Sequence, residues 1–230
     1  MSITPPIRAA LFDLDGTLLD TLADIAASAN AMLAELGLAS LPAAHIRDII
    51  GKGSAHMVGR LLEHQRPGDP ANAAQADAAL AHYLAHYRRI NGRHASPYPG
   101  VHEGLKAFAD QGMRLGVVTN KLTEFTRPLL EKTGLAHHFQ VIVCGDTCAR
   151  RKPDPMPVLH ACNSLDMAPA QTVLIGDSVN DTTAGRAAGT HVLAVPYGYN
   201  EGKQVHALDV DAIVSSIDAA AQWVDARNAG

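Results

Sequence analysis

The sequence has few aromatic residues and no excess of positive charge. Phenylalanine, tryptophan and tyrosine make up 4% of its 230 residues, so its core must consist mainly of alanine, leucine, valine and isoleucine. The formal net charge is −4, which excludes a broadly basic protein that binds nucleic acid by neutralising phosphates. Hydrophobic residues make up 47% and charged residues 18%, and this composition argues against intrinsic disorder.

Signals for secretion or membrane insertion are also missing. The N-terminus, MSITPPIRAALFDLDG, lacks the positive start and apolar region of a signal peptide. No stretch approaches the roughly 18 uncharged apolar residues of a membrane-spanning helix. The odd number of cysteines, three, then favours reduced thiols and a cytoplasmic location. Cys144 and Cys148 are four residues apart, but no suitably spaced partners complete a zinc site.

Short apolar runs alternate with helical patterns along most of the chain. Five runs are almost continuously apolar, as expected for parallel strands that are covered on both faces. They lie at 9–12, 114–118, 141–143, 172–175 and 191–195. Helical periodicity separates them at 101–111, 122–133, 155–165 and 179–188. The alternation predicts an α/β fold with a doubly wound, Rossmann-like parallel sheet.

One long segment interrupts this alternation. From about 22 to 92 the periodicity is helical and no strand pattern is visible, whereas a simple crossover needs only about a dozen residues. We therefore expect a small α-helical domain, 21–92, inserted after the first strand. The α/β core would comprise 1–20 and 93–230, with connections near Asp20–Thr21 and at 95–100.

Polar residues follow the predicted strands at the ends where open α/β sheets bind ligands. They include four carboxylates, one hydroxyl and one ammonium. These residues are Asp13, Asp15, Thr119, Lys152, Asp177 and Asp181. Carboxylates that converge in this way stay ionised only if cations offset them. Hard oxygen ligands without histidine or cysteine favour Mg²⁺, which often also binds a substrate phosphate.

This set of residues indicates phosphoryl transfer. A carboxylate beside Mg²⁺ and Lys152 can attack phosphorus and form an aspartyl phosphate. A second carboxylate two residues further along the chain, as Asp15 is from Asp13, can protonate the leaving alcohol and then activate water. The Thr119 hydroxyl and nearby backbone N–H groups can hold the phosphoryl oxygens.

The same residues resemble the motifs of the haloacid dehalogenase-like hydrolase superfamily. The segment FDLDGTLLD at 12–20 is similar to its first motif, and Thr119 to its second. Lys152–Pro153 is similar to its third motif, and GDSVND at 176–181 to its fourth. The helical insert resembles the small mobile cap of that superfamily.

The resemblance also implies a role for each residue. Asp13 would be the nucleophile and Asp15 the general acid and base. Mg²⁺ would be bound by Asp13, Asp177 and the main-chain carbonyl of Asp15, with Asp181 supporting the metal site. Thr119 and Lys152 would hold the phosphate.

Within the superfamily the sequence is similar to the phosphoglycolate phosphatases. The supporting segments are 50–53, 97–101, 119–121, 152–155 and 197–199. The resemblance implies a small phosphorylated metabolite as substrate, and 2-phosphoglycolate is the first choice. Phosphatases or mutases that act on sugar phosphates, and enzymes that act on pyrophosphate, share most of these segments and stay open as alternatives.

Neighbouring loops supply further candidate contacts. Gly16, Thr17 and Asn120 are candidate phosphate-binding residues. Gly51, Lys52 and Gly53 could contact the far end of the substrate when the cap closes, or could form a plain interhelical turn. We expect neither nucleic acid nor a membrane as a partner, and a monomer or a homodimer.

Other functions use parts of this pattern. A phosphorelay receiver domain is much shorter and has no helical insert after its first strand. A metal-free dehalogenase would gain nothing from the second crowded carboxylate of Asp15. Phosphonate cleavage would need a lysine imine, and Lys52, between two glycines, is too solvated for that chemistry. A non-catalytic phosphate-binding protein would not need the complete acidic set.

Overall fold

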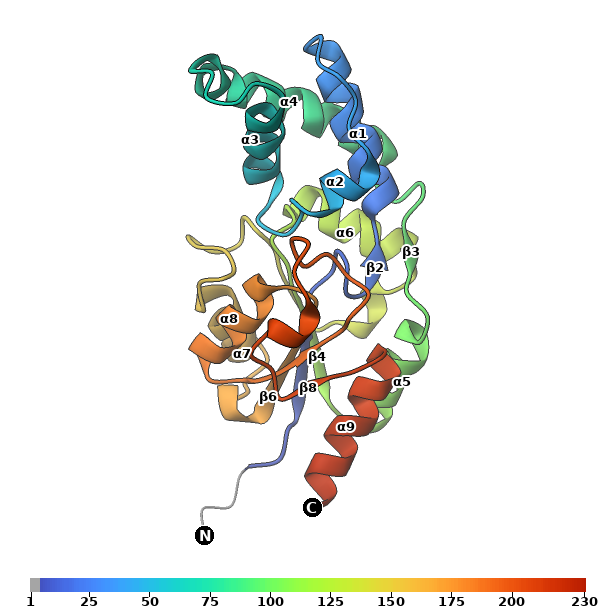
Figure 1. The fold of residues 1–230 in the computed structure, drawn as a ribbon. Helices are drawn as coiled ribbons and strands as arrows, with labels where there is room; N and C mark the ends of the chain where they lie inside the picture. The colour runs from blue at the N-terminus through green and yellow to red at the C-terminus, as the bar shows by residue number, and fades with distance from the viewer. Residues whose placement is uncertain (1–4) are drawn as a thin grey trace.

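The computed structural model describes residues 5–230, and a six-stranded sheet forms its centre (Figure 1). The strands are β1 (Ala9–Phe12), β4 (Arg114–Val118), β5 (Val141–Val143), β6 (Thr172–Gly176), β7 (His191–Ala194) and β8 (Ala212–Ile213). Their order is β5-β4-β1-β6-β7-β8 and all neighbours are parallel. The chain runs outward from β1 in both directions, so the topological switch point lies beside β1.

Helices cover both faces of the sheet. One face packs against α5 (Val101–Asp110), α6 (Thr123–Lys132) and α9 (Ile217–Ala229), and the other against α7 (Met156–Ser164) and α8 (Val179–Ala188). In β1, Ala10 and Phe12 belong to the first apolar cluster, whereas Ala9 and Leu11 belong to the second. All four are fully buried, which explains the unbroken apolar run. The predicted doubly wound α/β fold is confirmed.

The strands that sequence reasoning missed are short. They are β8 and the antiparallel pair β2 (Leu19–Asp20) and β3 (Ser96–Pro97), each of two residues. Two residues carry no readable periodicity. Three short 3₁₀ turns were likewise not predicted, at Ala136–His138, Pro169–Gln171 and Val205–Ala207.

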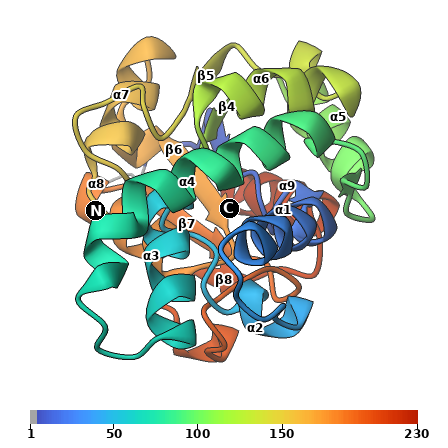
Figure 2. The same ribbon diagram turned by 90° about the horizontal axis from the view of Figure 1, so that it is seen from above.

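Four helices lie between β2 and β3. They are α1 (Leu22–Glu35), α2 (Ala43–Arg47), α3 (Ser54–Gln65) and α4 (Ala71–Ile90). We refer to residues 21–92 as the helical insert. Its helices share an apolar cluster that also takes in Phe125 and Tyr199 from outside the insert. Seen from above, α1, α3 and α4 lie over the sheet (Figure 2).

The two connections of the insert lie side by side, because β2 pairs with β3. A buried carboxylate joins them. Asp24, in the first turn of α1, is 0% exposed and accepts hydrogen bonds from the backbone N–H groups of Gly92, Arg93 and His94 at 2.9–3.1 Å. The start of the insert is thereby bonded to its end.

Within residues 5–230, no helix combines the length and the apolar character needed to cross a membrane. Cys144, Cys148 and Cys162 all carry free thiols.

Candidate active site

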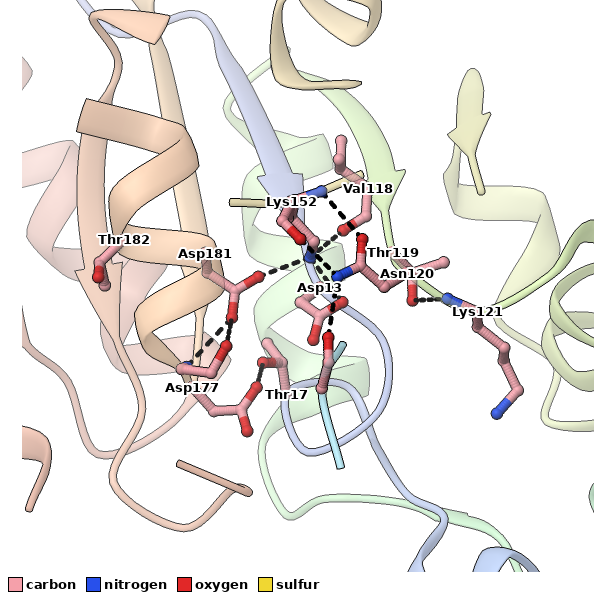
Figure 3. Close-up of polar contacts among 12 residues, drawn as sticks. Asp13, Thr17, Val118, Thr119, Asn120, Lys121, Lys152, Asp177, Asp181 and Thr182 are labelled. Carbon is pink, nitrogen blue, oxygen red and sulfur yellow. Dashed lines mark hydrogen bonds and ion pairs between the residues drawn. The ribbon is translucent and has the colours of Figure 1, made fainter. Parts of the chain in front are cut away.

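Three aspartates and one lysine meet where β1 and β6 end (Figure 3). Carboxylate oxygens of Asp13, Asp177 and Asp181 all lie within 4.8 Å of one another. The Lys152 ammonium lies 2.8 Å from Asp13 Oδ1 and 2.6 Å from Asp181 Oδ1, and it also donates to the carbonyl of Val118. The structure therefore brings together residues that are up to 168 positions apart in the chain.

This cluster has more negative than positive charge. Burial is the main cause that raises the pKa of Asp13 to about 6, and the neighbouring Asp181 adds to it. Burial, followed by repulsion from Asp181 and Asp13, raises the pKa of Asp177 well above its ordinary value. Burial opposes the charge of Lys152, but attraction to Asp13 and Asp181 raises its pKa above the ordinary value. One ammonium thus offsets the three carboxylates only in part.

The donor set fits a divalent cation such as Mg²⁺. All candidate ligand atoms are carboxylate oxygens, and an added cation would relieve the repulsion between them. The turn after β1 passes close to Asp177. Gly16 has a φ of +92°, and a Cβ atom at this position would lie 2.5 Å from Asp177 Oδ2. Only glycine satisfies both the backbone conformation and this close approach.

Neighbouring groups orient Asp177. The Thr17 hydroxyl donates to Asp177 Oδ1 at 2.8 Å, and the Tyr199 backbone N–H donates to Oδ2 at 2.5 Å. Thr17 was expected to contact phosphate. In this structure its hydroxyl faces the acidic cluster, and Thr17 is not among the residues that line the pocket described below. Tyr199 was not assigned a role from the sequence, because a backbone donor leaves no side-chain signal.

Asp181 is held by the start of its own helix. Its Oδ2 accepts hydrogen bonds from the backbone N–H and the hydroxyl of Ser178, at 3.1 and 2.6 Å, which completes a capping box for α8. Its Oδ1 faces Lys152. Asp181 therefore caps its helix through one carboxylate oxygen and faces the cluster through the other.

Asp15 is held by a different lysine. The Lys121 ammonium lies 2.8 and 3.0 Å from the two Asp15 carboxylate oxygens, and it donates to the Tyr87 hydroxyl at 2.7 Å. The Thr21 hydroxyl donates to Asp15 Oδ1 at 2.7 Å. Sequence reasoning did not select Lys121 or Tyr87 as site residues. The available signal was that Lys121 follows Thr119 by two residues at the same strand end.

A pocket lies between the strand ends and the helical insert. One wall comes from the α/β core and carries both Asp13 and Asp15. Its residues are Asp13, Asp15, Thr119, Asn120, Lys121 and Phe125. The opposite wall comes from the insert and is largely apolar or aromatic. Its residues are Ile25, Ile50, Gly51, Gly53, Ser54, Met57, Tyr83 and Tyr87.

The loop at 50–53 contributes backbone to this pocket. The Asn120 side-chain amide donates to the carbonyls of Gly51 at 2.8 Å and Lys152 at 2.9 Å, so it links the insert to the core. Gly51 and Gly53 line the pocket, whereas Lys52 does not. The Lys52 ammonium instead lies 2.7 Å from Glu201.

Comparisons with known proteins identify the family of the chain. The family model for haloacid dehalogenase-like hydrolases matches residues 10–195. A phosphoglycolate phosphatase from Thiobacillus denitrificans is 48% identical over 219 residues, which are 95% of this chain and 96% of that protein.

Solved structures show the same fold. A predicted phosphoglycolate phosphatase from Haemophilus somnus has a TM-score of 0.88 at 28% identity, and the match covers 94% of this chain and 97% of that one. CbbY from Rhodobacter sphaeroides, solved in complex with phosphate, has a TM-score of 0.76 at 25% identity, and the match covers 92% of this chain and 95% of that one.

The family model covers most of the chain, and the relative from Thiobacillus denitrificans aligns along almost its whole length. The chain therefore belongs to the haloacid dehalogenase-like hydrolases.

Proposed function

We propose that this protein is a Mg²⁺-dependent phosphatase that hydrolyses a small phosphomonoester, in the first place 2-phosphoglycolate, through a phosphoaspartate on Asp13. One observation carries the proposal. The Asp13 carboxylate lines the pocket, contacts the buried Lys152 ammonium and lies in the three-aspartate cluster. The relative from Thiobacillus denitrificans, a phosphoglycolate phosphatase, supports the choice of substrate.

Asp13, Asp177 and the main-chain carbonyl of Asp15, with Asp181 in support, would hold Mg²⁺. The bound ion would supply positive charge beside the phosphoryl group. Within the chain, Lys152 keeps the Asp13 carboxylate in place through the 2.8 Å contact. The Thr119 hydroxyl, which lines the same pocket, would donate to a phosphoryl oxygen.

The reaction would proceed in two displacements. An Asp13 carboxylate oxygen attacks phosphorus while the bond from phosphorus to the ester oxygen breaks, and Asp15 gives its proton to the leaving alkoxide. Asp15, now ionised, then takes a proton from a water molecule. The oxygen of that water attacks phosphorus, which releases inorganic phosphate and restores the Asp13 carboxylate.

The helical insert would act as a cap over this reaction. It forms the apolar wall of the pocket, and its Tyr87 hydroxyl accepts a hydrogen bond from Lys121, the lysine that contacts Asp15. Its two connections are paired as β2 and β3, so the insert could tilt as one unit. Closure over the bound ester would exclude bulk water during the attack by Asp13.

A phosphate-release screen tests the proposal. The panel contains 2-phosphoglycolate, sugar phosphates and pyrophosphate, each with Mg²⁺ and with EDTA. We expect 2-phosphoglycolate to be cleaved fastest, EDTA to stop turnover and added Mg²⁺ to restore it. Asp13→Asn should abolish phosphate release while the fold survives, and the exposed control Asp110→Asn should keep wild-type rates. Wild-type turnover in EDTA would remove the metal from the proposal, and normal turnover by Asp13→Asn would remove the nucleophile.

A further inference from the structure

The pocket has little positive charge to offer a second anionic group. Among the described residues that line it, Lys121 is the only one with a cationic side chain. The Lys152 ammonium contacts Asp13, Asp181 and the Val118 carbonyl, so its three hydrogens already have acceptors. 2-Phosphoglycolate carries a carboxylate, one methylene away from the ester oxygen. A carboxylate transferred into a mainly apolar cleft needs a cationic partner.

We propose that Lys121 is the residue that binds the carboxylate of the substrate, and that it makes the pocket selective for phosphate esters with a second anionic group. This inference rests on the proposed function, because it names the contact by which 2-phosphoglycolate would be distinguished from uncharged esters. It assigns to Lys121 the contact with the far end of the substrate, for which the loop at 51–53 was a candidate.

The position of Lys121 suits this contact. Thr119 and Lys121 follow β4 on one short stretch of chain, and both line the pocket together with Asp13. A phosphoryl group placed between Asp13 and Thr119 therefore leaves the rest of a two-carbon ester close to Lys121. In Figure 3 the Lys121 side chain lies apart from the cluster around Lys152, so the two ammonium groups serve different parts of the site.

The contacts of Lys121 leave it able to take a new anion. The side chain is 6% exposed, and its ammonium is shared between the Asp15 carboxylate and the Tyr87 hydroxyl. The Tyr87 hydroxyl is a neutral acceptor on the helical insert. A substrate carboxylate could replace it and would form a stronger, charge-assisted hydrogen bond, while the contact with Asp15 is kept.

Two other cations near the pocket, Lys52 and Arg47, have partners elsewhere. Lys52 pairs with Glu201, and the Arg47 guanidinium donates to the carbonyls of Tyr197 and Gly198. Neither residue is part of the pocket lining. Lys52 stands as the rival, because it lies on the loop between two lining glycines.

The test compares two substrates of similar size in Lys→Met variants. For each enzyme we would measure kcat/KM for 2-phosphoglycolate and for ethyl phosphate, which lacks the carboxylate. Loss of a buried charged partner corresponds to about 100-fold, so Lys121→Met should lower the ratio of the two values by about that factor. Any common loss caused by disturbing Asp15 cancels in the ratio.

Two further variants and a binding measurement sharpen the test. Lys121→Arg keeps the charge and should retain most of the preference for 2-phosphoglycolate. Lys106→Met, on the exposed side of α5, is the matched control and should leave the ratio unchanged. In an Asp13→Asn background, calorimetry with Mg²⁺ should show that Lys121→Met weakens binding of 2-phosphoglycolate much more than binding of ethyl phosphate.

The outcomes separate the inference from the proposed function. If the wild-type enzyme does not prefer 2-phosphoglycolate to ethyl phosphate, the proposed substrate is wrong and the inference falls with it. If the wild type shows the preference and Lys121→Met keeps it, only the inference is overturned. A collapse of the ratio in Lys52→Met instead of Lys121→Met would assign the carboxylate to the rival lysine.

Discussion

Replacement of Lys152 by methionine should strongly destabilise the metal-free protein at neutral pH. The Lys152 side chain is 2% exposed and its ammonium contacts both Asp13 and Asp181. Methionine has a similar length but no charge, so the variant buries three converging carboxylates with no cation from the chain. Removal of one partner from a buried ion pair costs about 3–5 kcal/mol. For a chain of this size, the melting temperature should fall by roughly 10 °C.

The loss should depend on pH in a defined direction. The pKa of Asp13 is raised by burial to about 6 in the folded protein, so protonation of this carboxyl favours folding. Its contribution is fully present below its ordinary pKa of 3.8 and is lost as pH rises through about 6. Asp177, whose pKa is also raised, acts in the same direction. The deficit of Lys152→Met should therefore be largest near pH 8 and should shrink towards pH 5.

Urea unfolding in EDTA at pH 8 and at pH 5 measures both effects. Lys106→Met is the control, because its exposed ion pair with Asp110 should contribute less than about 1 kcal/mol. Mg²⁺ should restore part of the stability of Lys152→Met at pH 8. A loss below about 1 kcal/mol at pH 8, or a larger loss at pH 5 than at pH 8, would refute the view that Lys152 is the cation that makes this cluster tolerable.

Three other measurements probe the site and its connections. Calorimetric Mg²⁺ affinity should rise at least tenfold between pH 5 and pH 7, because the ligands must be deprotonated and the pKa of Asp13 is raised to about 6; equal affinity at both values would contradict this. Gly16→Ala would place a Cβ atom 2.5 Å from Asp177 Oδ2 at a φ of +92°. The Mg²⁺ concentration for half-maximal phosphate release should therefore rise about tenfold or more, and an unchanged concentration would show that the turn adapts without displacing Asp177. Asp24→Asn would turn an amide donor towards backbone N–H groups that now donate to Asp24, and should lower the unfolding free energy by about 1–3 kcal/mol; an unaltered urea midpoint would argue against this anchor.

The fold class and the acidic cluster could be predicted because their signals are local or follow from a general rule. A parallel strand buried on both faces must be apolar at every position, as in 9–12, and this pattern is visible without any knowledge of neighbours. The convergence of Asp13 with Asp177 follows from the rule that parallel strands present their carboxyl ends at one edge. The five long strands were accordingly predicted to within one residue at each end.

Pairings between flexible or distant groups could not be predicted in the same way. The hydrogen bond of 2.8 Å from the Thr17 hydroxyl to Asp177 was not predicted, because the two residues are 160 positions apart in the chain. The sequence left open whether Lys52 contacts the substrate or lies in a plain turn, and it gave no sign that a loop 149 positions away would present Glu201 to it. The contact between Lys121 and Asp15 depends on how β4 lies against β1.

The sequence by itself determined that this chain forms a doubly wound sheet with acidic residues at its strand ends, because burial on two faces and parallel order impose those patterns directly. Only the tertiary structure decided which lysine meets which aspartate. Lys121 and Lys152 both follow strands at the same edge, and their long side chains could reach several carboxylates. The packing of the helical insert, through Tyr87 on α4, and the capping of α8 by Asp181 fix the acceptors that each ammonium finds.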